Sequence, residues 1–173
     1  MLYYAYVAVS LLTAIFLDSF LFARLNIMGV RPDCMMALTV SLGVLLGQQE
    51  GMLFGLIGGL IMDVLFGRAV GIGAIAYMFA GAAGGIFYKK FYADNIIVPS
   101  VTAAACALAK ENLMALAVRV QGGRFGYFEM LFAYMVPCAL LTGGLCALLH
   151  LTLKPTLQRQ VKKHYDRNAG GIR

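Results

Sequence analysis

Charged side chains inside apolar segments are the residues of this sequence most able to do chemistry. Lys110 and Glu111 lie deep in one apolar run, and Asp63 lies at the end of another. Ionisable groups in such surroundings are costly, and they are functional candidates by default. Neighbouring helical residues point about 100° apart, so Lys110 and Glu111 cannot easily pair with each other. At least one of them must face a bundle interior, a polar cavity or another chain, unless Lys110 snorkels; the alternative is a buried structural network.

Two aspartates stand beside turn signals. Asp33 follows Pro32, and proline holds the residue before it in extended geometry. Asp33 therefore suits a helix N-cap, whose oxygen accepts an N–H group from the next turn. Asp63 precedes the turn Gly67–Gly73. We interpret Asp63 as binding backbone N–H groups of that turn, with a polar contact in a cavity or with a partner as the alternative.

Catalytic and metal-binding patterns are absent from the sequence. There is no GxSxG, HExxH, Walker loop or GxGxxG motif, and His150 and His164 are isolated. The four cysteines form no CxxC pair, and we interpret them as core or lipid-facing residues: Cys34, Cys106, Cys138 and Cys146. The aspartates lack the Gly-Asp motifs of intramembrane aspartyl proteases and the signatures of lipoprotein signal peptidases. We predict no enzyme, no metal site and no cofactor.

The composition indicates which solvent surrounds these residues. The chain has 173 residues, of which 61% are apolar and 13% charged, and its mean hydropathy is +0.81. A soluble domain is about half apolar and about a quarter charged. The sequence therefore predicts an integral membrane protein, and it excludes a cytosolic enzyme, a secreted disulfide scaffold and a disordered regulator.

The fold class predicted is all-α, a polytopic membrane bundle of about six transmembrane helices. The segments are Leu2–Phe22, Met35–Gly47, Met52–Phe66, Val70–Tyr88, Ile96–Val118 and Tyr127–Leu153. A full span needs about 20 residues, so the second and third segments are either short or tilted spans or a partly re-entrant pair. The polar residues 48–50 separate these two, and Pro137 predicts a kink in the last segment.

Basic residues predict the orientation and the domain organisation. We expect one bundle domain, residues 1–153, and a basic cytoplasmic tail, residues 154–173, which carries +5 of the net charge of +6. With the tail inside, eight Lys and Arg residues lie on the cytoplasmic side and five on the outer side, which favours cytoplasmic N- and C-termini. A neutral body with such a tail excludes a nucleic-acid partner. The tail either lies on anionic membrane lipids, through an apolar stripe of Leu157, Val161 and Tyr165, or is a plain positive-inside anchor.

Small residues recur every four positions through the middle of the chain. Glycine stands at 43, 47, 51, 55 and 59, Asp63 takes the next position, and Gly67 and Gly71 follow. Small residues at this spacing lie near one helix face and let helix backbones approach closely. The face serves either tight packing within the chain or the docking of a partner's transmembrane helix.

The segment Gly29–Ala74 resembles the rod shape-determining protein MreD family. In that family an extracytoplasmic Pro-Asp precedes a Gly-rich hairpin that ends in Asp, with Gly four and eight residues later. These positions map onto Pro32, Asp33, Asp63, Gly67 and Gly71. The match covers roughly residues 29–92, and Glu111 in the fifth segment is also in keeping. Cys34 stands where the family usually has Leu, and Lys110 is an addition to which the resemblance gives no role.

The resemblance implies a bacterial plasma-membrane component of the cell-elongation machinery that is not an enzyme. It implies a six-helix bundle similar to the S-components of ECF vitamin transporters. It also implies direct binding to the single-span protein MreC, within a complex that contains MreB, RodA and a class B penicillin-binding transpeptidase. We predict a scaffold for side-wall peptidoglycan synthesis and cell shape, in which Gly55, Gly59, Asp63 and Glu111 shape a groove or cavity for MreC.

Two other functions stay open at this point. The chain could be a vitamin-binding S-component, although its first helix is bulky and lacks the regular Ala-rich coupling surface expected of one. It could also be a membrane chaperone or a lipid-handling protein. A vitamin retained after purification in mild detergent would favour the first alternative, and a rod-shaped depletion strain would favour the second.

Overall fold

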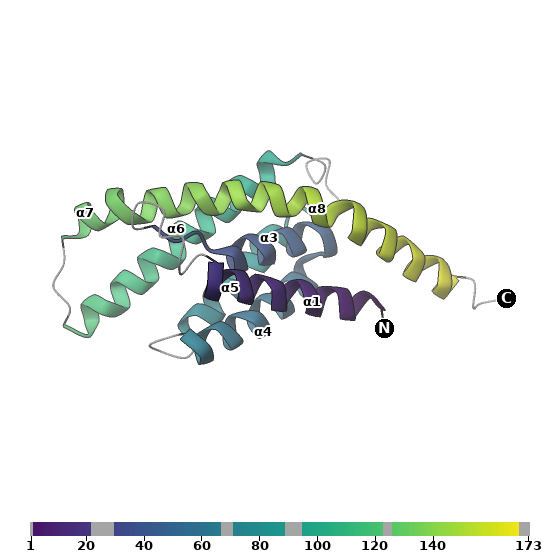
Figure 1. Ribbon diagram of the computed structural model, residues 1–173, viewed down its shortest axis with the longest axis horizontal. Coiled ribbons are helices and arrows are strands. Elements are labelled where there is room, and N and C mark those ends of the chain that lie inside the picture. The colour runs from purple at the N-terminus through teal and green to yellow at the C-terminus, as the bar shows by residue number, and fades with distance from the viewer. Residues whose placement is uncertain (1, 22–29, 67–70, 89–94, 123–125, 170–173) are drawn as a thin grey trace.

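The computed structural model describes residues 2–21, 30–66, 71–88, 95–122 and 126–169, and the side-chain surroundings within 6–20, 30–66, 71–88, 95–122 and 126–155 (Figure 1). In these ranges the regular elements are all helical. They are α1 (Leu2–Phe16) with its π-helical continuation η1 (Leu17–Leu21), α3 (Cys34–Leu46), α4 (Gln48–Phe66), α5 (Ile72–Gly85), α6 (Ile97–Val120), and the continuous run of α7 (Tyr127–Met130), π-helical η3 (Leu131–Met135) and α8 (Val136–Ala169). The predicted all-α bundle is confirmed.

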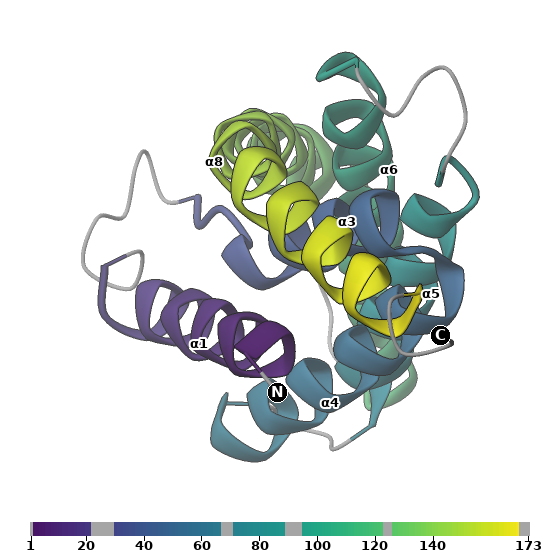
Figure 2. The same cartoon turned by 90° about the vertical axis from the view of Figure 1, so that its right-hand side faces the viewer.

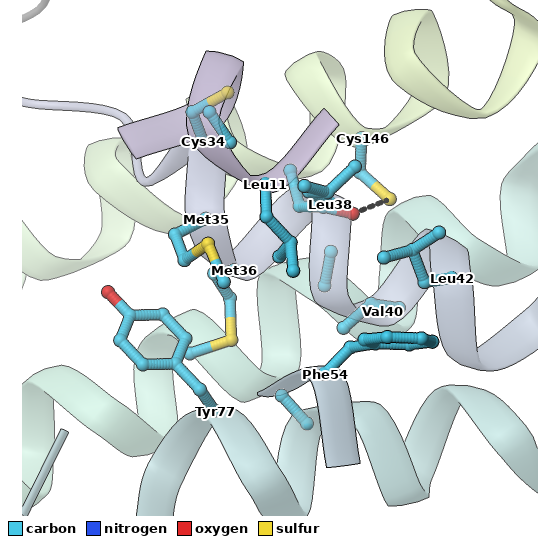
Figure 3. Close-up of a cluster of buried hydrophobic side chains, with 14 of the residues drawn as sticks. Leu11, Cys34, Met35, Met36, Leu38, Val40, Leu42, Phe54, Tyr77 and Cys146 are labelled. Carbon is cyan, nitrogen blue, oxygen red and sulfur yellow. Dashed lines mark hydrogen bonds between the residues drawn. The ribbon is translucent and has the colours of Figure 1, made fainter. Parts of the chain in front are cut away.

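Helix α3 is the centre of the bundle. It has 13 residues, of which only Leu45 is not buried. Its neighbours are α1, α4, α5, α6 and α8, and Figure 2 shows it enclosed among them. A helix that is apolar on every side is either a membrane span or a core helix, and the burial of α3 makes it a core helix. Figure 3 shows how its methionines and aliphatic side chains meet Leu11, Phe54 and Tyr77 from three other helices.

The helices differ in length. Judged by length and composition, Gln48–Phe66, Ile97–Val120 and Tyr127–Pro155 can each cross a membrane, whereas Tyr6–Phe20, Cys34–Leu46 and Ile72–Gly85 are shorter. The predicted short second segment is confirmed as α3. The predicted span Val70–Tyr88 is wrong as a continuous helix, because α5 ends at Gly85 and residues 86–88 form a turn. Two consecutive glycines at that end weaken the helix.

The predicted start of the third segment is wrong, whereas the last predicted segment, Tyr127–Leu153, agrees with the apolar span Tyr127–Pro155. Residues 48–50 do not break the apolar run, since they form the first turn of α4, where Glu50 suits the positive helix end. The break is the single residue Gly47, whose φ of 113° favours glycine. At the other end, α8 continues helically past Leu153 and contains Pro155, and Figure 1 shows it turning away from its earlier course in its C-terminal part.

Pro137 lies two residues after the end of a π-helical turn. A proline ring clashes with the carbonyl of the fourth residue before it and removes one backbone hydrogen bond. The π-helical turn η3 ends at Met135, so the wider turn covers the residues that this clash would affect. The sequence predicted a kink at Pro137, and what the structure shows there is the π-helical turn η3.

The glycine face of α4 packs against α5. A Cβ atom at Gly55 would lie 2.4 Å from the carbonyl oxygen of Tyr77, and one at Gly59 would lie 2.6 Å from the Cα atom of Ala74. A Cβ atom at Gly81 of α5 would lie 2.1 Å from the carbonyl oxygen of Gly51. The small residues therefore let the backbones of α4 and α5 touch, which is the predicted packing within the chain.

We predict that Gly81→Ala destabilises the protein. The added methyl group meets backbone atoms that cannot rotate away, and overpacking of this kind costs about 1–3 kcal/mol. Gly144→Ala is the matched control, because a Cβ atom at Gly144 meets nothing within 4 Å. The measurement is the temperature at which half of the detergent-purified protein stays monodisperse. Equal temperatures for the two variants would contradict close packing of α4 and α5.

Candidate functional site

A small polar cavity lies at the N-terminal end of α3. Its volume is about 150 Å³. It is lined by residues from most of the described helices and from the segment before α3: Asp18, Arg31, Pro32, Asp33, Met62, Tyr77, Lys110, Glu111 and Tyr134. Charged groups from three separate parts of the chain, namely η1, the segment before α3, and α6, therefore meet in an otherwise apolar bundle.

Two carboxylates cap the buried start of α3. Asp33 is the N-cap, and its Oδ1 accepts the N–H group of Met36 at 2.7 Å. Asp18 accepts the N–H groups of Cys34 and Met35 at 2.7 and 2.8 Å. The first N–H groups of a helix have no partner within the helix, and here all three find one. The predicted capping role of Asp33 is confirmed.

The other oxygen of Asp33 binds Lys110. Its Oδ2 accepts hydrogen bonds from Lys110 Nζ and, at 3.0 Å, from the hydroxyl of Tyr77. Lys110 Nζ also donates to the Tyr77 hydroxyl at 3.1 Å and lies 5.0 Å from the centre of its ring. The Asp33 N–H group donates to Thr142 Oγ1 at 3.0 Å. One residue thus joins α3 to α5, α6 and α8.

The remaining charged groups lie toward the outside of this network. Glu111 Oε1 is 4.0 Å from Lys110 Nζ, and its side chain keeps 15% of its surface exposed. Arg31 is exposed. The sequence predicted that Lys110, Glu111 or both face the interior, and both line the cavity. Arg31 is the most exposed charged group of the cavity, whereas Glu111 and Lys110 are each only 15% exposed.

Asp63 lies apart from the cavity, in the last turn of α4. Its Oδ2 accepts the N–H groups of Gly71 and Ala74 at 2.8 and 2.9 Å. Gly71 has a φ of 108° and precedes the first residue of α5. The predicted binding of backbone N–H groups is confirmed. Gly67, which the sequence placed in the same motif, lies outside the described residues.

The structure therefore divides the predicted site residues into two groups. Pro32, Asp33 and Glu111 line the cavity, whereas Gly55, Gly59, Asp63 and Gly71 belong to the packing of α4 on α5.

Sequence reasoning gave no role in the cavity to Asp18 or Tyr77, and it named Lys110 without naming its partner. The available signal was the cost of a charge in an apolar helix. That cost requires a partner of opposite charge for Lys110, and Asp33 is that partner.

The sequence suggested that His150 is isolated, but in the structure it has a side-chain neighbour. It is fully buried, and its Nδ1 lies 3.1 Å from the hydroxyl of Ser41, which is also fully buried. A Ser–His contact is a familiar nucleophile and base arrangement, but here both side chains lie inside the core. The side chain of His164 lies outside the described surroundings.

The polar side chains of the cavity bind main-chain groups and one another. Asp18 and Asp33 already accept main-chain N–H groups, and Lys110 is bound to Asp33 and Tyr77. Such groups fix the positions of helices. Among the residues that the structure describes, no group of three or more His, Cys, Asp or Glu could hold a metal ion.

One comparison with known proteins gives a match. The family model described as rod shape-determining protein MreD matches residues 1–157. These residues include every described helix except the last part of α8. No curated protein and no solved structure matches the chain. The family match does not favour the alternative of a vitamin-binding S-component.

We predict that Lys110→Met destabilises the protein by about 3–5 kcal/mol, because it leaves the carboxylate of Asp33 buried without its cation. Combining it with Asp33→Asn should recover part of the loss, since asparagine still caps a helix and carries no charge. Arg119→Met is the control, because it removes an exposed cation from the same helix and should change stability by less than about 0.5 kcal/mol. The measurement is again the loss of monodisperse protein on heating, and a Lys110→Met variant as stable as the control would show that the pair is not needed.

Proposed function

The chain belongs to the rod shape-determining protein MreD family, and we propose that it works as a non-enzymatic membrane scaffold for side-wall peptidoglycan synthesis. The observation that carries the proposal is the family match over residues 1–157. A membrane protein that determines rod shape must act on the site or the activity of wall synthesis. The proposal adds that it does so by holding other proteins together rather than by chemistry of its own.

The geometry of the cavity supports binding rather than catalysis. Its carboxylates cap α3, and its lysine neutralises one of them. A general acid or base must be able to exchange protons with a substrate within hydrogen-bond reach. Arg31 is exposed and Glu111 is partly exposed, and their opposite charges suit a polar contact with another chain.

We propose MreC as the direct partner, with RodA, the class B transpeptidase and MreB as further members of the complex. Helix α5 already packs against Gly55 and Gly59. The proposed docking surface for MreC therefore lies elsewhere. The proposal places one contact of MreC at the mouth of the cavity, where Glu111 lines the opening. We place the chain in the bacterial plasma membrane with both termini in the cytoplasm, because the larger number of basic residues then lies inside.

The test is depletion of the protein in its own bacterium, followed by capture of partners. Depletion should convert rods into rounded cells. Gly144→Ala should restore rods, whereas Gly81→Ala should restore them poorly. Affinity-tagged protein from native membranes should retain MreC, identified by mass spectrometry, and an unrelated multi-pass protein tagged in the same way should not. Rods that persist during depletion would contradict the cellular function, and a preparation without MreC would contradict the direct contact.

A further inference from the structure

Glu111 is the carboxylate of the polar cavity that has no cation of its own. Asp18 accepts two main-chain N–H groups, and Asp33 accepts one and also binds Lys110. Among the cations that the structure describes, only Lys110 lies within 4.0 Å of a Glu111 oxygen, and Lys110 already neutralises Asp33. The Glu111 side chain is only 15% exposed, so water screens its charge poorly.

The cavity carries more negative than positive charge. Three carboxylates line it, those of Asp18, Asp33 and Glu111, and two cations, Lys110 and Arg31. Arg31 is exposed, and it lies within 4.0 Å of none of these carboxylates. A charge inside an apolar bundle is costly unless an opposite charge accompanies it. The cavity therefore favours a further cation beside Glu111.

The size and the depth of the cavity limit what this cation can be. The cavity volume is about 150 Å³, whereas pockets for small molecules measure about 300–1,000 Å³, so the end of one side chain fits better than a whole small molecule. Helix α6 is long enough to cross a membrane and ends at Val120. Glu111 lies about 14 Å along the helix from that end, which is deeper than lipid headgroups, which lie at the membrane surface. A side chain on a second membrane-spanning helix can reach this depth.

We propose that the bound partner chain places one lysine or arginine side chain in the cavity, where it pairs with Glu111. This inference rests on the proposed scaffold function, because it requires a membrane partner. The partner carries the basic residue on its membrane-spanning helix, and an unpaired cation there is as costly for the partner as Glu111 is for this chain. Association therefore satisfies both charges at once. Arg31 lines the same cavity and opposes the incoming cation, so the pair depends on Glu111 and not on Arg31.

The test measures how much MreC, the partner proposed above, stays with the affinity-tagged full-length chain from native membranes. Glu111→Gln keeps the shape of the side chain and removes its charge, so retained MreC should fall by about tenfold. Glu111→Asp keeps the charge and should retain about half of the wild-type amount or more. Arg31→Gln removes the opposing cation and should raise retention by about twofold. Glu129→Gln is the matched control, because it removes an exposed carboxylate that does not line the cavity, and it should retain the wild-type amount.

Three results would overturn the inference. If wild type and Glu111→Gln retain equal amounts of MreC, Glu111 pairs with no partner cation, while the proposed scaffold function stands. If Arg31→Gln lowers retention, the partner supplies a carboxylate to Arg31 instead of a cation to Glu111. If wild type retains no MreC, the proposed contact itself is wrong and the inference falls with it. Each variant must first match the wild-type melting temperature in detergent; if Glu111→Gln does not, the sign of the Arg31→Gln effect decides.

Discussion

The bond between Asp33 and Lys110 is the interaction on which the rest of the structure depends. Helix α3 is buried, so its first N–H groups cannot bind water and need acceptors inside the bundle. Carboxylates meet that need, but they bring negative charge into an apolar interior, where an unpaired charge is expensive. Lys110 balances the charge, and it comes from a helix that must therefore lie beside α3. The pairing of Asp33 with Lys110 therefore allows a carboxylate to cap α3, balances its charge and places α6 beside α3.

A second constraint is the close approach of α3, α4 and α5. The contact at Gly43, Gly51 and Gly81 brings backbone atoms of all three helices together. Van der Waals packing, which close backbones allow, is one of the interactions that hold helices together in lipid, where there is no hydrophobic effect between apolar surfaces. The polar cluster then fixes one end of this packed unit, and the Asp63 turn fixes the same end of its α4–α5 hairpin.

Local features of the sequence predicted local structure well. The apolar runs gave the helices, Asp33 was recognised as a cap, and Asp63 as the partner of a turn. The pairing of Asp33 with Lys110 was not predicted, because 77 positions separate them and only the fold brings them together. The start of α4 was misplaced because three polar residues suggested a loop, whereas one glycine with a positive φ was enough to end α3. The family adds the cellular role, which no local pattern contains.

The single-residue link at Gly47 has a consequence for how the protein is made. A segment as short as α3 is a poor substrate for insertion by itself, since it cannot reach across the hydrocarbon core. With only Gly47 between them, α3 and α4 can leave the ribosome and the translocation channel as a preformed pair. Asp18, which caps α3, comes from an earlier part of the chain, and Lys110, the partner of the other cap Asp33, comes from a later part. Helix α3 can therefore reach its final position only after α6 has been synthesised.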